Sequence, residues 1–162
     1  MLEFGEANNC RYRHINYMTV PSLFMAFDFG AKRTGVAVGQ EITATARPLT
    51  TIASINQQPN WSAIEALVTE WQPTQLVVGI PAKCDQNKSV RKKIINFSQE
   101  LQQRFNLPVQ LHDETLTSDE AYLQLKNKRE QIKGKINKAD IDQYAAAIIL
   151  ESWMNARPTD PS

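Results

Sequence analysis

Apolar residues of this chain occur first in short runs and later at helical spacing. The run Leu23 to Phe29 (LFMAFDF) is almost continuously apolar and is followed by Gly30, which indicates a buried strand that ends in a turn. A second strand over 34–38 (TGVAV) follows a short connection, so the two strands predict a hairpin. The segment 43–52 is rich in threonine and predicts a third strand, in which Pro48 suggests an edge position or an irregularity.

The spacing then becomes helical. One helix is predicted from Trp61 to Trp71, with Ser62 and Glu65 as a capping box and Pro73 behind its end. The apolar run 76–80 (LVVGI) predicts a buried strand. A second amphipathic helix is marked by five apolar residues at helical spacing: Val90, Ile94, Phe97, Leu101 and Phe105.

The last third predicts one more strand and two helices. The strand begins at 109–111 and runs into His112, Asp113 and Glu114, and Thr117 with Glu120 suggests a capping box for a short helix. The segment 141–153 predicts a closing helix with Asp140 as its N-cap. A three-strand antiparallel meander followed by strand–helix units predicts an α/β fold, a mixed sheet of about five strands flanked by helices on both faces.

Length and composition favour one domain in a reducing compartment. The 162 residues suit a single domain over 21–155, with 1–20 expected to be disordered or an extension before a start at Met18, and 156–162 a flexible tail. Cys10 and Cys84 are far apart, which argues against a disulfide framework or zinc site. No apolar run suits a membrane span and the N-terminus lacks a signal sequence, so a cytoplasmic protein is expected. The net charge of +1 requires any nucleic-acid surface to come from local clustering.

Three acidic residues stand in unusual places. Asp28 interrupts an apolar strand, where an unpaired carboxylate is costly, although it could also cap the turn through Gly30. Glu114 ends a strand, and Asp113 before it must point to the other sheet face; both could instead favour a helix N-terminus. Asp142 heads an apolar helical stripe, or simply interacts with the helix dipole.

Together these acids predict a metal site if the fold brings them to one edge of the sheet. Clustered carboxylates raise one another's pKa values unless cations bind, and such oxygen ligands suit Mg²⁺ or Mn²⁺. Two such ions can activate a water and stabilise the leaving oxygen in phosphodiester cleavage.

Four segments in order resemble the YqgF/RuvX family. They are FDFGAKRTGVAV (27–38), LVVGIP (76–81) with Asp85 behind it, HDETLT (112–117) and DIDQYAAAIILES (140–152). The resemblance covers residues 23 to 154 and implies an RNase H-like fold, a cytoplasmic protein and a nuclease role in maturing the 5′ end of precursor small-subunit ribosomal RNA. It also implies a link to Holliday-junction resolvases, with Asp28, Glu114 and Asp142 as catalytic, metal-binding acids and Asp113 as an accessory acid.

The chain departs from the family pattern at two places. Thr115 replaces an arginine, and Ala82, Lys83, Cys84 and Gln86 replace the usual residues around Asp85. These departures concern substrate contacts more than the metal site.

Basic residues cluster in the stretch 126–138, directly before the helix that carries Asp142. They could hold phosphates or could form an ordinary solvated loop. The nucleic-acid-binding candidates are Lys32, Arg33, Lys83, Arg91, Lys126, Lys128, Arg129, Lys133, Lys135 and Lys138, with Lys88, Lys92 and Lys93 as further candidates. The tryptophans at 61, 71 and 153 lie on apolar helical faces and are interpreted as core residues.

The leading hypothesis is a Mg²⁺- or Mn²⁺-dependent nuclease that acts on ribosomal RNA precursors, with ribosomal particles as further partners. One alternative is a resolvase of branched DNA, which needs two active sites and hence a dimer, whereas the first function suits a monomer or a homodimer. Another is a nucleic-acid-binding factor whose acids are structural. Actin-like and sugar-kinase ATPases share the opening strand pattern, but they need two large lobes, for which one domain has no room.

Overall fold

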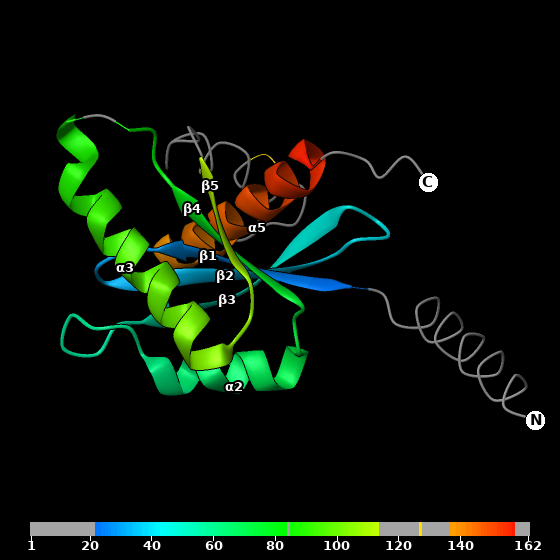
Figure 1. Cartoon of the computed structure of the whole chain (residues 1–162), viewed down its shortest axis with the longest axis horizontal. Coiled ribbons are helices and arrows are strands. Elements are labelled where there is room, and N and C mark those ends of the chain that lie inside the picture. The colour runs from blue at the N-terminus through cyan, green and yellow to red at the C-terminus, as the bar shows by residue number, and fades with distance from the viewer. Residues whose placement is uncertain (1–21, 84, 114–126, 128–136, 158–162) are drawn as a thin grey trace, which may run out of the picture.

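A five-stranded mixed sheet forms the centre of the molecule (Figure 1). The structure, a computed structural model, describes residues 22–83, 85–113, 127 and 137–157. The strands are β1 (Leu23–Phe29), β2 (Arg33–Gln40), β3 (Thr45–Ala53), β4 (Gln75–Ile80) and β5 (Val109–Asp113). Their order across the sheet is β3-β2-β1-β4-β5, so β1 is the central strand.

The pairing confirms the predicted meander followed by strand–helix units. β1 pairs with β2 and β2 with β3 in antiparallel fashion, whereas β1 pairs with β4 and β4 with β5 in parallel. β3 is an edge strand, and its register with β2 shifts between Val36 and Ala37, opposite Thr50 and Pro48. The irregularity that Pro48 predicts is therefore present, because proline cannot donate a ladder hydrogen bond.

Helices cover both faces of the sheet. Figure 1 shows α2 (Trp61–Trp71) and α3 (Lys88–Phe105) on one face and α5 (Lys138–Ala156) on the other. A short 3₁₀ turn, η1 (Asp85–Asn87), precedes α3. None of the helices in the described segments is long and apolar enough to cross a membrane.

Strand alternation divides the core into two layers. In β1, Met25 and Phe27 pack toward α2 and α3, whereas Phe24 and Ala26 pack toward α5. The same alternation directs Asp28 to the α5 face. A single acidic residue in a central strand is thus aimed at the helix that carries Asp142.

The contact between α5 and β2 is built from small side chains, whereas the end of α5 packs larger ones such as Trp153 against β1. Ala37 of β2 packs with Ala146 and Ala147 of α5, and all three are buried. Gly35 is so close to α5 that a Cβ atom there would lie 2.0 Å from the backbone carbonyl oxygen of Asp142. The helix backbone can approach the sheet this closely because β2 offers glycine and alanine on this face.

The tryptophans serve packing, as the sequence predicts. Trp61 stacks on Phe97 with ring centroids 5.5 Å apart, and Trp153 meets Phe24 edge-to-face at 5.0 Å. Trp71 is partly buried against the same core as Trp61. Val90, in contrast, was expected on the buried face of α3 and is 50% exposed. It lies in the first turn of α3, before the helix reaches the core at Ile94.

Both predicted helix caps are wrong. α2 is capped by Asn60, whose side-chain oxygen accepts a hydrogen bond from the Ala63 amide at 3.2 Å, so Ser62 already lies inside the helix. α5 is capped by Asn137, which accepts from the Asp140 amide at 2.8 Å. Asp140 is the third helical residue and completes a capping box. In each case an earlier asparagine satisfies the free amides.

Some sequence predictions lie outside the described residues. These are the short helix at Thr117 and Glu120, the N-terminal extension before residue 21, and the tail from residue 158 onward.

The approach of α5 to β2 predicts that Gly35→Ala lowers the free energy of unfolding by about 1–3 kcal/mol, since the new methyl group meets rigid backbone. Gly79→Ala is the matched control. Its Cβ would meet only side-chain atoms of Ile149, the nearest being Cδ1 at the end of that side chain. That side chain can move, so the control should stay within about 1 kcal/mol of wild type. Urea unfolding of both variants measures the difference, and equal losses would contradict this account.

Candidate active site

Asp28 lies near the end of β1, where its neighbour across the ladder is Gly35 of β2. Directly paired residues of an antiparallel ladder face the same side, so both face α5. Because Gly35 has no side chain, it leaves room above β2 for the first turns of α5. That is where Asp142 lies.

Asp142 is held in place by contacts to its side chain and to its helix. Arg33 at the start of β2 donates from Nε to Oδ2 of Asp142 at 2.7 Å. Thr51 of β3 donates from Oγ1 to the carbonyl oxygen of Ala139 at 2.5 Å. The start of α5 is therefore attached to two strands of the meander.

The Asp28 carboxyl group lies in an environment that disfavours its charge. Burial, and then the negative charge of Asp142, raise the pKa of Asp28 from 3.8 to about 7. Arg33 bonds to Asp142 from a partly exposed position, where an ion pair contributes only about 0–1 kcal/mol. The arginine therefore orients Asp142 more than it stabilises the fold. Asp28 keeps an unfavourable environment that a bound cation would relieve.

The third predicted acid cannot be placed, because Glu114 lies outside the described residues. Two hydrogen bonds show which face of the sheet the even-numbered residues of β5 occupy. Gln110 accepts a hydrogen bond from Trp153 at 2.8 Å and His112 bonds to Ser152 at 2.9 Å, so even-numbered residues of β5 face α5. Asp113 is exposed and has the opposite parity. It belongs to the other sheet face, as the sequence predicts.

The donor set fits a hard divalent cation. Asp28 and Asp142 supply carboxylate oxygens, which suit Mg²⁺ or Mn²⁺ rather than a soft metal. Within the segments that the structure describes, no group of three or more His, Cys, Asp or Glu residues could hold a metal ion. The described part of the site thus provides two of the three predicted ligands.

The basic candidates divide into several groups. Arg33 is engaged by Asp142, and Arg91 donates to the carbonyl oxygen of Pro81, which ties α3 to the loop after β4. Lys32, Lys83 and Lys138 are exposed. The further candidates Lys88, Lys92 and Lys93 are exposed on α3. The others, Lys126, Lys128, Arg129, Lys133 and Lys135, lie outside the described residues.

Sequence reasoning missed the contributions of Arg33, Gly35 and Thr51 to positioning Asp142. A signal existed only for Gly35, because a glycine inside a strand often marks a close backbone approach. The partners of Arg33 and Thr51 are 109 and 88 positions away in the chain, and no local pattern reports such contacts.

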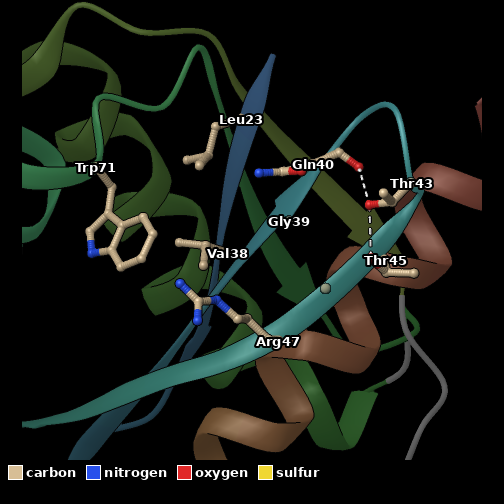
Figure 2. Close-up of a pocket in the computed structure, with 9 residues that line it drawn as sticks. Leu23, Val38, Gly39, Gln40, Thr43, Thr45, Arg47 and Trp71 are labelled. Carbon is tan, nitrogen blue, oxygen red and sulfur yellow. Dashed lines mark hydrogen bonds between the residues drawn. The ribbon is translucent and has the colours of Figure 1, made fainter. Parts of the chain in front are cut away.

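A hollow at the opposite end of β1 has a different character. It encloses about 300 Å³ and is lined by residues such as Leu23, Val38 and Gln40, with no carboxylate among them. Figure 2 shows Arg47 of β3 reaching toward Trp71 of α2, and its guanidinium carbon lies 5.1 Å from the centre of a Trp71 ring. This hollow cannot supply the oxygen ligands of the acidic site.

Comparison with known families agrees with this geometry. The model of the RuvX family, described as Holliday junction resolvase, matches residues 22–156. The chain belongs to this family. It is therefore a nuclease, a hydrolase of phosphodiester bonds.

Curated relatives in this family match almost their full length. A protein of Azotobacter vinelandii is 40% identical over 144 residues, which are 87% of this chain and 99% of the relative. A protein of Photorhabdus laumondii is 45% identical over 134 residues, covering 82% and 95%. Both carry the name "Putative pre-16S rRNA nuclease".

Solved structures confirm the RNase H-like fold. RuvC of T. thermophilus, in complex with a Holliday junction substrate, aligns with a TM-score of 0.55 at 15% identity, covering 84% of this chain and 95% of RuvC. The fowlpox virus Holliday junction resolvase aligns with a TM-score of 0.53 at 18% identity, covering 83% and 99%. At these identities the likeness concerns the fold alone.

The raised pKa of Asp28 predicts how stability depends on pH in EDTA. From about pH 4 to 7 the folded protein retains a proton that the unfolded chain has released, so wild type should lose stability relative to Asp28→Asn as pH rises. The slope for one proton is at most about 1.4 kcal/mol per pH unit. The loss should level off above pH 7, where both states are ionised. Urea unfolding of both proteins at several pH values measures this loss. If the difference in their free energies of unfolding stays constant, or if wild type gains stability relative to Asp28→Asn as pH rises, the environment described for Asp28 is wrong.

Proposed function

We propose that this RuvX-family chain is a Mg²⁺- or Mn²⁺-dependent nuclease that processes the 5′ end of precursor 16S ribosomal RNA. The observation that carries the metal dependence is the meeting of Asp28 and Asp142 on one face, at the end of the central strand. Two carboxylates brought together from residues 114 positions apart favour cation binding over any role in folding, because they repel each other.

Each residue has a distinct part in this proposal. Asp28 and Asp142 would hold the cation, and Glu114 is proposed as the third ligand. A cation held by these carboxylates would activate a water and stabilise charge on the leaving oxygen. Arg33 keeps the Asp142 carboxylate oriented. Asp113 faces the other side of the sheet, so its proposed accessory role lies outside the ligand set of Asp28 and Asp142.

The substrate assignment is supported by the curated relatives, whose name refers to pre-16S rRNA. Lys32, Lys83 and Lys138 are exposed and available for phosphate contacts. A substrate of this kind further implies a cytoplasmic location, with ribosomal precursor particles as partners.

A second candidate is the resolution of branched DNA. The family description and the two solved structures refer to Holliday junctions. This activity requires two active sites at matched spacing, hence a dimer. The measured mass in solution and the preferred substrate separate the two candidates.

The central test is cleavage of labelled precursor 16S rRNA, single-stranded RNA and a four-way DNA junction with Mg²⁺, Mn²⁺ or EDTA. Asp28→Asn and Asp142→Asn should each lower metal-dependent cleavage by about two orders of magnitude or more, since each removes a proposed ligand. Glu70→Gln, an exposed acid on α2, is the matched control and should cleave like wild type. Equal metal-dependent cleavage by Asp28→Asn would show that Asp28 is not a ligand, whereas no cleavage by wild type above the level of Asp28→Asn on any substrate would favour a binding factor with structural acids.

Metal binding can also be measured without activity. At pH 8, Mg²⁺ or Mn²⁺ at ten times its dissociation constant should stabilise wild type by about 1.4 kcal/mol. For a domain of this size that raises the melting temperature by roughly 3–6 °C. Asp28→Asn should show little or no shift. A shift of the same size in the variant would show that the ion binds elsewhere.

A further inference from the structure

A second hollow lies at the Asp28 end of β1, on the other face of the sheet. It encloses about 360 Å³, and Phe29, Gln58, Lys93 and Asn96 are among its lining residues. Phe29 directly follows Asp28 in β1, and the two side chains point to opposite faces. The hollow and the acidic site are therefore separated only by the end of one strand.

One wall of the hollow is a tight turn after β3. Ile55 and Gln58 exchange two backbone hydrogen bonds of 2.9 Å, and the residues between them, Asn56 and Gln57, have φ values of 51° and 63°. A left-handed backbone costs roughly 1–2 kcal/mol at a residue such as glutamine, and glycine would avoid this cost. The amide of Ser54 also bonds to the carbonyl oxygen of Lys32 at 2.9 Å, which ties the turn to the loop behind Asp28.

The lining combines aromatic surface with hydrogen-bonding groups of both kinds. Phe29 stacks on Phe97 with ring centroids 4.6 Å apart and an angle of 26°. Gln57, Gln58 and Asn96 each carry an amide, which can donate and accept.

Charge selects among the ligands of suitable size. The lining contains one cation, Lys93, and one anion, Glu100, which lie about two turns apart on α3. Their opposite charges disfavour a phosphate group. They suit instead a neutral heterocycle whose edge offers both donors and acceptors, as a nucleobase does, and amide side chains are well suited to read such edges.

We propose that this hollow binds an unpaired nucleobase of the substrate, next to the phosphodiester bond cleaved at Asp28. The base packs against Phe29 and forms hydrogen bonds with Gln58 and Asn96, while the strand crosses the end of β1 to the acidic site. The inference rests on the proposed nuclease function and adds that the substrate is single-stranded beside the cleaved bond. The hollow at the other end of β1 is a weaker candidate, because Arg47 already lies over Trp71 there.

The test is a titration of the ¹⁵N-labelled full chain in EDTA with single-stranded hexauridylate, followed through side-chain amide resonances in NMR spectra. A six-unit abasic ribose-phosphate oligomer is the control ligand. The amides of Gln58 and Asn96 should shift with the base-containing oligomer and not with the abasic one. Equal shifts with both oligomers, or no shift of these amides, would overturn the proposal.

A paired-variant experiment links the hollow to affinity. The double variant Gln58→Ala/Asn96→Ala should bind hexauridylate about tenfold more weakly, the expected loss for two hydrogen bonds. The matched control is Gln99→Ala/Gln102→Ala, two exposed residues of α3 outside the hollow. It should bind within about twofold of wild type. Equal weakening by both pairs, or by neither, would overturn the proposal.

Failure of the nuclease function would have a different signature. It would appear as metal-dependent cleavage that Asp28→Asn leaves unchanged, and it would not alter the titration, which uses no metal and no cleavage.

Discussion

Two carboxyl groups are held together where helix α5 touches strand β2. Asp28 faces α5 from the central strand, and Asp142 enters from the helix because Gly35 allows the two backbones to meet. The mutual repulsion and the burial of Asp28 are unfavourable for folding, as its raised pKa shows. The packing of the rest of the structure must therefore offset the unfavourable free energy of this site. Such local costs are common where binding or catalysis requires a particular arrangement.

The two faces of the sheet contribute to this in different ways. The face under α2 and α3 is packed with large side chains, including Phe27, Leu76 and Leu101. The face under α5 also buries large side chains, among them Phe24 and Trp153, but at β2 it uses small residues such as Ala37 and Ala146. The close approach of α5 is thus confined to the part of the sheet where β2 and α5 both offer small residues.

The proposed metal site and the proposed base-binding hollow lie at the same end of β1. Consecutive residues of a strand point to opposite faces, so Asp28 serves the acidic site and Phe29 the hollow beside α3. A nucleic-acid strand that crosses the end of β1 would meet both. On the acidic side, Arg33 orients Asp142 through an ion pair that contributes little to stability. On the other side, the turn at Asn56 and Gln57 shapes the hollow with a strained, left-handed backbone.

Much of the fold was predictable from local patterns. The range Leu23–Phe29, the meander, the strand–helix alternation and the irregularity at Pro48 all follow from periodicity and from proline chemistry, which depend on neighbours in the chain. Asp28 and Asp142 stand out by sequence because an acid in an apolar pattern needs a reason. The helix caps were predicted wrongly, since several polar residues near each helix start are chemically able to cap and only the backbone decides which one does.

Only the tertiary structure decided which groups meet. The pairing of Arg33 with Asp142, the contact of Thr51 with Ala139 and the approach of α5 to Gly35 join segments roughly a hundred residues apart. Periodicity reports which face of an element is buried, but it does not report what lies against that face. The sequence by itself therefore determined the elements, their order and which acidic residues are candidates for a metal site. The packing of α5 on the meander determined that Asp28 and Asp142 share one site, because that contact depends on the summed shape of both surfaces.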